Sequence, residues 1–180
     1  NVELRIYGRS NPYLESILES CRRDGLEGAV RHMGFRNLEG IVEGIRESDL
    51  GLVPNQRSIF TELNTPTRIF EYLSCGTAVI APRAAGITDY FGPQDLLFFE
   101  LGDADDLTRK IEEAWLHPET VREVVMRGQA ICRKHAWSQG KLEFMQIAGS
   151  LLGVAAPRVP QRTAAPSHHP VADPLLYQGH

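Results

Sequence analysis

TPTRIFEYLSCGTAVIA, residues 65–81, is the stretch that decides the fold. Pro66 stands where the first residue of a helix is expected. Proline is tolerated there because the amide hydrogen it lacks would have no partner within the helix. Thr65, just before it, is a suitable N-cap. Apolar residues then recur at helical spacing as far as Gly76, where the helix is expected to end. The run at 77–81 predicts a strand covered on both faces, which is typical of a parallel sheet.

The same alternation of apolar runs and helical patterns continues on both sides of this stretch. Further strands are expected at residues 2–7, 29–33, 49–54 and 96–99. Further helices are expected after Asn11-Pro12, over residues 38–45, after the N-cap Asp103, after His117-Pro118 and after the N-cap Ser138. Alternation of this kind indicates βα units, so the sequence predicts an α/β fold with a parallel sheet flanked by helices.

Composition narrows the class of protein. The chain has 180 residues, of which 42% are hydrophobic, enough for one ordinary domain with a buried core. The 23 acidic residues outnumber the 19 basic ones without any block of like charge, which disfavours nucleic-acid binding. No stretch approaches the length of a membrane span, and we expect a cytoplasmic protein.

The end of the chain differs in composition from the rest. We expect one folded domain over residues 1–153 and a disordered tail over 154–180, because the tail is rich in proline and alanine and shows no apolar periodicity. His168-His169 in that tail has no partner at metal-ligand spacing. Asp103-Ala104-Asp105 is interpreted as a helix cap, and no metal is expected.

The three cysteines, Cys21, Cys75 and Cys132, are odd in number and lie far apart in the sequence. They lack the C-x-x-C spacing of a zinc or redox site. We therefore expect free, buried thiols.

Polar residues follow several of the expected strands. In an open parallel sheet, ligands bind beyond the carboxyl ends of the strands. The loops there read Gly8-Arg9-Ser10, Gly34-Phe35-Arg36-Asn37 and Asn55-Gln56-Arg57. A single arginine at such a place is more often solvated than functional, but three at one edge favour an anionic ligand.

The start of the helix at Pro66 offers a second set of groups for an anion. The amides of Thr67 and Arg68 are expected to be unpaired, and the hydroxyls of Thr65 and Thr67 are donors, so a phosphate or diphosphate fits here. A well-capped helix without any ligand explains the same pattern. Glu71 lies one turn beyond Arg68, where it is placed either to form an ion pair with it or to accept hydrogen bonds from ribose hydroxyls.

A family resemblance covers residues 2 to about 152. It rests on LRIYG (4–8), VRHMGF (30–35), SDLGLVP (48–54), PTRIFEYLSCGTAVIA (66–81), Ala85-Gly86 and Leu101-Gly102-Asp103 in this order. Together these segments resemble the C-terminal, donor-binding domain of the large retaining GT-B glycosyltransferase family. The resemblance implies a Rossmann-like sheet and the transfer of a hexosyl group from a nucleoside-diphosphate sugar to an acceptor, with retained anomeric configuration. The donor sugar is then a substrate, and no cofactor is expected.

The resemblance also implies roles for individual residues. Glu71 falls on the second glutamate of the family's E-x7-E motif, which is expected to hold the donor ribose. Thr65, Pro66 and Thr67 fall on the segment expected to meet the diphosphate, with Arg68 beside it as a stabilising cation. The loop of Gly34, Phe35 and Arg36 falls where the base is expected, and Gly8 and Arg9 are expected near the same cleft.

Two departures from the family pattern stand out. Leu63 occupies the position of the first motif glutamate and Glu62 is one residue away, as in a subgroup that carries Pro-x-Lys/Arg-x-x-Glu-Tyr here. The usual first strand with its Gly-Arg-x-x-x-x-Lys-Gly loop, and the N-terminal acceptor-binding domain, do not precede Asn1. We therefore expect a fragment of a longer protein that lacks the first strand of its sheet and is inactive alone.

Two other functions remain open from the sequence. Leu63 is compatible with a non-catalytic GT-B-like module that binds a nucleotide or a partner protein. A nucleotide-sugar epimerase of related fold is the other alternative, and it requires catalytic acids and a histidine, most of which this chain does not show.

Overall fold

The computed structural model describes residues 2–153, and in this range it confirms the predicted alternation of strands and helices. The strands are β1 (Leu4–Tyr7), β2 (Val30–Gly34), β3 (Leu50–Leu52), β4 (Ala78–Pro82) and β5 (Leu97–Phe99). The helices are α1 (Pro12–Arg23), α2 (Leu38–Arg46), α3 (Ile59–Leu63), α4 (Arg68–Ser74), α5 (Ala85–Thr88), α6 (Ala104–Leu116), α7 (Pro118–Lys134) and α8 (Trp137–Leu152). All the strand pairings described are parallel, as predicted.

The chain divides into two compact units, one ending at Ser48 and the other starting at Asp49, and each is described by itself. A single domain over residues 1–153 stays a prediction. The tail over 154–180, with the pair His168-His169, lies outside the described residues.

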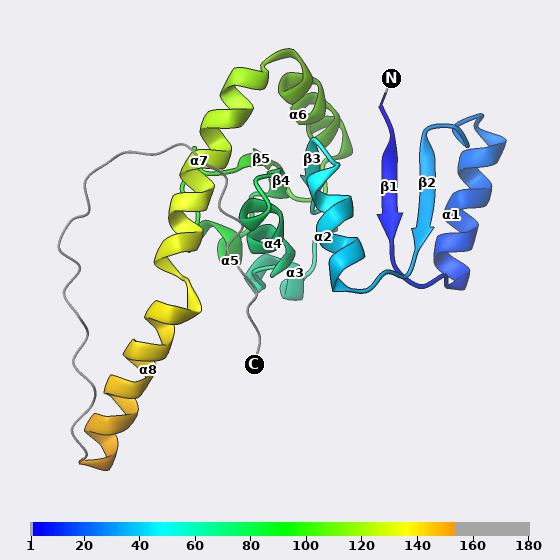
Figure 1. Cartoon of the computed structure of the whole chain (residues 1–180). Coiled ribbons are helices and arrows are strands. Elements are labelled where there is room, and N and C mark those ends of the chain that lie inside the picture. The colour runs from blue at the N-terminus through cyan, green and yellow to red at the C-terminus, as the bar shows by residue number, and fades with distance from the viewer. Residues whose placement is uncertain (1, 154–180) are drawn as a thin grey trace. The chain divides into compact units, whose positions relative to one another are not determined.

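The first unit is a two-stranded sheet with two helices. β1 and β2 run side by side, with Leu4 opposite Val30, and α1 follows β1 (Figure 1). The side chain of Asn11 accepts a hydrogen bond from the amide of Leu14, so α1 begins with an N-cap at the predicted Asn11-Pro12. α2 is capped in the same way by Asn37.

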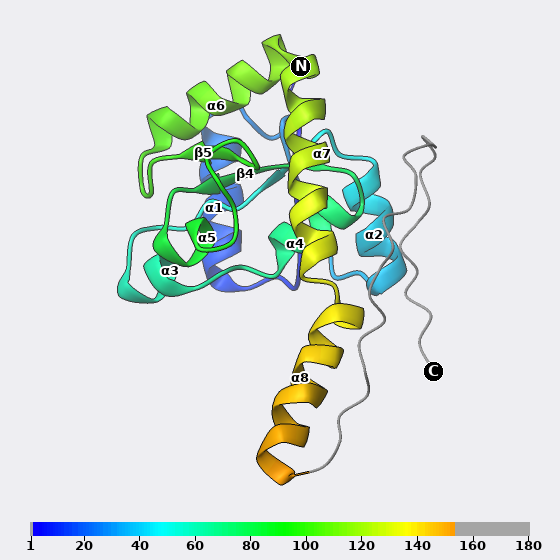
Figure 2. The same cartoon turned by 90° about the vertical axis from the view of Figure 1, so that its left-hand side faces the viewer.

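The second unit holds the hydrophobic core. Its sheet has the order β3-β4-β5, and all five residues of β4 are buried, as expected for a strand covered on both faces. α4 and α7 pack against β4 and against each other, and α6 packs against β5 (Figure 2). The core consists of Val53, Ile69, Leu73, Val79, Ala81, Ala84, Ile87, Phe91, Leu96, Phe98 and Leu101.

The strands of each unit are parallel and are joined by helices, with the order β1-β2 in the first unit and β3-β4-β5 in the second. The predicted α/β fold, a Rossmann-like arrangement of parallel strands flanked by helices, is thus confirmed.

Three local features differ from the sequence prediction. The loop that follows β3 leads into α3, a helix that was not expected and that begins with a capping box formed by Ser58 and Thr61. The short helix α5 was not expected. The last helix starts at Trp137 after Ala136, and no side chain caps it, so the prediction of Ser138 as its N-cap is wrong.

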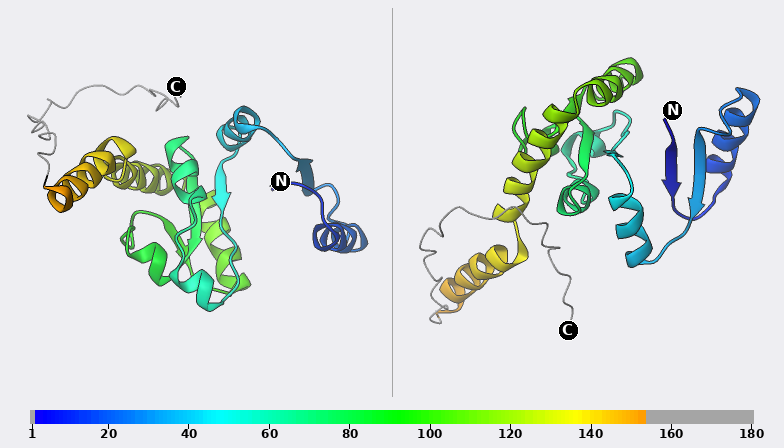
Figure 3. Two further views of the ribbon diagram at one scale, coloured as in Figure 1. Left: turned by 90° about the horizontal axis from the view of Figure 1, so that it is seen from below. Right: turned by 45° about the horizontal axis from the view of Figure 1, so that its top comes forward.

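α8 runs on from the end of α7 (Figure 3). None of its residues is buried. Large apolar side chains are exposed along it, including Trp137 (74%), Phe144 (66%) and Leu151 (81%). Among residues 2–153, none of the helices combines the length and the apolar character needed to cross a bilayer.

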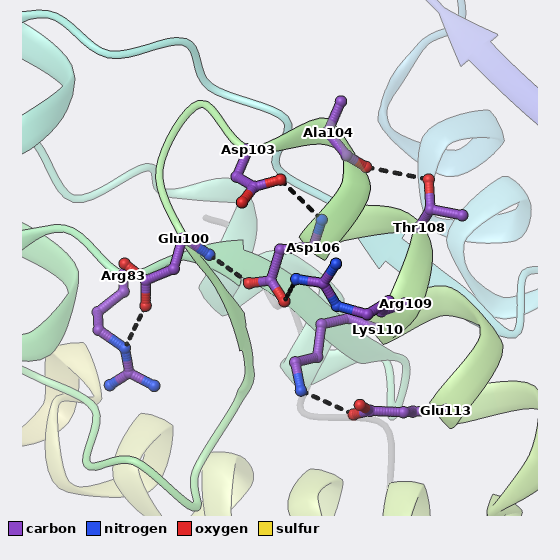
Figure 4. A network of polar contacts seen from close by, with 9 residues as sticks. All are labelled: Arg83, Glu100, Asp103, Ala104, Asp106, Thr108, Arg109, Lys110 and Glu113. Atoms are coloured by element: carbon purple, nitrogen blue, oxygen red, sulfur yellow. Dashed lines mark hydrogen bonds and ion pairs between the residues drawn. The ribbon is translucent and has the colours of Figure 1, made fainter.

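The loop between β5 and α6 is held by a network of polar contacts (Figure 4). Asp103 accepts a hydrogen bond from the amide of Asp106 at 2.9 Å, which confirms Asp103 as the N-cap of α6. The carboxylate of Asp106 accepts from the amide of Glu100 at 2.7 Å and from Arg109 at 3.0 Å. These contacts hold the pKa of Asp106 below its usual value, mainly through the hydrogen bond from Glu100. The carboxylates that follow β5 therefore brace the turn into α6.

Cys21, Cys75 and Cys132 form no disulfide, in line with the prediction, although they are half-buried rather than buried. Desolvation raises the pKa of the Cys132 thiol from 9.0 to about 11, against a smaller opposing effect of Arg133. The folded state therefore keeps this proton at pH values where the unfolded thiol has lost it. The contribution to stability is present below pH 9.0 and is lost as the pH rises toward about 11.

We therefore expect the free energy of unfolding to fall more steeply above pH 9.0 for the wild type than for Cys132→Ser, which has no thiol to ionise. Urea denaturation at a series of pH values from neutral upward measures this difference. Parallel pH profiles for the two proteins would show that Cys132 titrates alike in the folded and unfolded states.

Candidate functional site

The first group of predicted site residues lies at the carboxyl ends of β1 and β2. The amide of Gly8 donates to the carbonyl of Gly34 at 3.0 Å, so the two strand ends are joined there. Both glycines have positive φ, 147° and 73°, which other residues rarely adopt. The guanidinium carbon of Arg9 lies 5.2 Å from the ring centroid of Phe35, within the range of a cation–π contact. The structure thus brings together Gly8, Arg9, Gly34 and Phe35.

The surface of this first group is aromatic and cationic. The Phe35 side chain is 63% exposed, although large aromatic residues are usually buried. Arg36 is exposed beside it and donates to the carbonyl of Phe35 at 3.3 Å. An exposed ring next to two guanidinium groups suits a planar, negatively charged ligand.

His32 belongs to the same group, and the sequence reasoning missed it. Its Nε2 lies 2.9 Å from the carbonyl oxygen of Gly8. A carbonyl only accepts hydrogen bonds, so Nε2 carries the proton. The sequence could have pointed to His32, because it lies in an expected strand two residues before Gly34. The hydrogen bond fixes the turn that leads into Arg9.

The second group is the segment from Leu63 to Tyr72. Here the structure corrects the start of the helix. α4 begins at Arg68 after Thr67, and no side chain caps it, so the prediction of Thr65 as N-cap is wrong. The Thr65 hydroxyl instead donates to the carbonyl of Gly86, 2.5 Å away. Pro66 is buried, and its carbonyl accepts from the amide of Ile69 in the turn that leads into the helix.

One face of α4 is buried and the other is exposed. Ile69 and Leu73 are fully buried in the core, whereas Thr67, Arg68 and Glu71 are exposed. Arg68 and Glu71 form no ion pair with each other within the described structure, although their spacing allows one. Both side chains are therefore available to a ligand.

Tyr72 attaches α4 to β3. A Cβ atom at Gly51 would lie 2.5 Å from atoms of the Tyr72 ring, so the ring packs directly on the bare backbone of Gly51. Burial raises the pKa of Tyr72, with the positive charge of Arg68 opposing the shift and the negative charge of Glu71 adding to it. The neutral phenol holds the helix in place next to the two charged side chains.

Position 63, where the family motif has its first glutamate, holds a leucine in this chain. The side chain of Leu63 is 70% exposed. Glu62 forms an ion pair with Arg57, with 2.6 Å between Nη1 and Oε1. Arg57 also donates to the carbonyl of Leu101 at 3.3 Å. Glu62 therefore braces the loop after β3.

Within residues 2–153, no cluster of three or more histidine, cysteine, aspartate or glutamate side chains has a geometry that could hold a metal ion.

Several solved structures resemble this chain in fold. HepE of Anabaena in complex with UDP superposes with a TM-score of 0.65 and 20% identity, over 85% of this chain and 41% of that chain. Sucrose-phosphate synthase of Thermosynechococcus elongatus gives a TM-score of 0.72 and 19% identity, over 84% and 39% of the two chains. A glycosyltransferase of Rickettsia africae gives 0.72 and 12% identity, over 84% and 40%.

At these identities the likeness shows a shared fold. The chain spans about 40% of the length of these solved structures. HepE has also been solved in complex with UDP-glucose. No curated protein matches the sequence significantly.

A family model described as glycosyl transferase-like matches residues 1–146, which is most of the chain. The match includes both groups of predicted site residues, from Gly8 to Arg36 and from Thr65 to Glu71. The chain belongs to the glycosyl transferase-like family.

Proposed function

We propose that this chain is the donor-binding part of a retaining GT-B glycosyltransferase, which transfers a hexosyl group from a nucleoside-diphosphate sugar to an acceptor. The observation that carries the proposal is the exposed row of Thr67, Arg68 and Glu71 on a helix whose other face is fixed in the core. The family membership and the UDP complexes of HepE support it.

The segment at the start of α4 is proposed to bind the diphosphate and the ribose. The first amides of a helix lack partners within the helix, and those of Thr67 and Arg68 suit phosphate oxygens. Arg68 adds a charge-assisted hydrogen bond. The carboxylate of Glu71, one turn further along, accepts hydrogen bonds from the ribose hydroxyls.

The first group is proposed to bind the nucleobase. In the family pattern this is the role of the loop that holds Gly34, Phe35 and Arg36. The exposed ring of Phe35 offers a stacking surface, and Arg9 and Gly8 supply a cation and a compact turn beside it.

The reaction proposed breaks the bond between the anomeric carbon of the sugar and the diphosphate oxygen. Negative charge grows on the diphosphate as it departs. Amides and the guanidinium group of Arg68 that face this oxygen stabilise the transition state more than the ground state. We also propose that the acceptor is bound by a part of the protein outside this chain, that the protein is cytoplasmic, and that this chain alone is inactive.

A transfer assay tests the reaction class. The intact protein is incubated with UDP-, ADP- and GDP-sugars of known anomeric configuration and an acceptor, and the new linkage is read by NMR. We expect the product to keep the configuration of the donor. A product of inverted configuration would contradict a retaining enzyme.

A non-catalytic nucleotide- or partner-binding module is the second candidate. The exposed Leu63 at the position of the first glutamate, and the pairing of Glu62 with Arg57, favour it. The transfer assay separates the two, since such a module binds a donor or a partner without turnover.

Glu62 is not expected to take part in donor binding. Glu62→Gln removes an exposed ion pair, and such pairs contribute at most about 1 kcal/mol to stability. We therefore expect the affinity for the donor to stay within about twofold of the wild type, measured by calorimetric titration. A loss of about tenfold or more would assign Glu62 to the donor site.

A further inference from the structure

The segment before α4 lies directly against the short helix α5. The Thr65 hydroxyl donates to the carbonyl of Gly86 at 2.5 Å in a partly buried contact. Gly86 is itself buried, and a Cβ atom there would lie 2.4 Å from the carbonyl oxygen of Leu63 and 2.9 Å from the carbonyl carbon of Asn64. The backbone of 63–65 thus rests on Gly86 with no room for a side chain.

α5 is a fixed support for this contact. Its residue Ile87 is fully buried, and Ala84 just before it is 4% exposed, both within the hydrophobic core. The carbonyl of Ala84 accepts from the amides of Ile87 and Thr88. The contact from Thr65 to Gly86 therefore ties the segment to the core, and Pro66, the next residue, is itself buried.

The hydroxyl of Thr65 has a single proton. That proton is donated to Gly86, and the oxygens of a diphosphate are acceptors that need donors. The hydroxyl therefore cannot donate to a phosphate oxygen while the observed hydrogen bond is made. This excludes the contact role that the sequence suggested for the Thr65 side chain in this conformation.

We propose that Thr65 is a positioning residue: its hydroxyl holds the backbone of residues 64–68 on α5, so that the groups of Thr67 and Arg68 are in place before the donor arrives. The inference rests on the function proposed above. Preorganisation of this kind raises affinity because the segment has less freedom to lose on binding.

The test compares three variants of the intact protein. Thr65→Val removes the hydroxyl and keeps the shape, and Thr65→Ser restores it. Thr88→Val is the matched control, because among the described residues the Thr88 hydroxyl bonds only to the carbonyls of Ala84 and Ala85. The affinity is measured for whichever of UDP, ADP and GDP the wild type binds. Amide hydrogen exchange of residues 64–68 is measured in the free protein.

We expect Thr65→Val to weaken nucleotide binding by about five- to tenfold and to speed amide exchange at 64–68. Thr65→Ser is expected to restore both, and Thr88→Val to change neither. Weaker binding with unchanged exchange would mean that the hydroxyl contacts the ligand, and unchanged binding would remove any role in positioning. If the wild type binds none of the three nucleotides, the proposed function itself fails.

Discussion

Replacing Gly86 with alanine is expected to lower the free energy of unfolding by about 3 kcal/mol, the upper end of the cost of overpacking a core. The added methyl group would lie 2.4 Å from the carbonyl oxygen and 2.6 Å from the carbonyl carbon of Leu63. These are backbone atoms, and neither can rotate away as the end of a side chain can. Either α5 or the segment leading to α4 must shift. We therefore expect weaker nucleotide binding as well.

Gly140→Ala is the matched control for this experiment. Gly140 lies within α8, and nothing is found within 4 Å of the position of an added Cβ. Alanine is favoured over glycine inside a helix, so this variant is expected to gain about 0.5 to 1 kcal/mol. Urea denaturation of both variants gives the two free energies. If Gly86→Ala is as stable as the wild type, the close packing of α5 on Leu63 does not exist in solution.

Glu71→Ala is expected to have the largest effect on donor affinity. The carboxylate is exposed and forms no ion pair within the described residues, so its loss leaves the fold intact. Losing a hydrogen bond between a charged group and a ribose hydroxyl costs about 1.5 to 3 kcal/mol, which corresponds to roughly 10- to 150-fold in Kd. Calorimetric titration with a nucleoside diphosphate measures the loss.

Two comparisons make the result for Glu71 specific. Glu112→Ala removes an exposed glutamate from α6 and is expected to leave the affinity unchanged. The corresponding 2′-deoxynucleotide should bind the wild type more weakly, while Glu71→Ala should discriminate little between ribose and deoxyribose. Equal binding of the nucleotide by Glu71→Ala and the wild type would show that Glu71 does not hold the ribose.

The order of elements and the strand-end group were predictable because both depend on local patterns. The proline at residue 66, the glycine at residue 76 and the apolar run after it mark a helix and a buried strand by their own chemistry. Arg9 and Phe35 meet because the carboxyl ends of parallel neighbouring strands lie at one edge. The position of these strand ends follows from the parallel sheet alone, without knowledge of contacts between residues far apart in the sequence.

The contacts of Thr65 were not predictable for the opposite reason. Its hydroxyl partner, the carbonyl of Gly86, is 21 residues away, and a threonine before a proline looks like an N-cap when only its neighbours are considered. The same holds for Arg57, which reaches the carbonyl of Leu101, 44 residues away. The spacing of Arg68 and Glu71 allowed an ion pair and a ligand site equally, and the absence of an ion pair between them in the described structure could not be read from the spacing.

The proposed function requires that this chain bind the nucleotide part of a sugar donor. Calorimetric titration of the intact protein with UDP, ADP, GDP and their sugars tests it most directly. We expect that a nucleotide with one of the three bases is bound at a single site, and that Glu71→Ala weakens this binding by roughly 10-fold or more while Glu112→Ala does not. No binding of any of these nucleotides, or binding that is unchanged in Glu71→Ala, would contradict it.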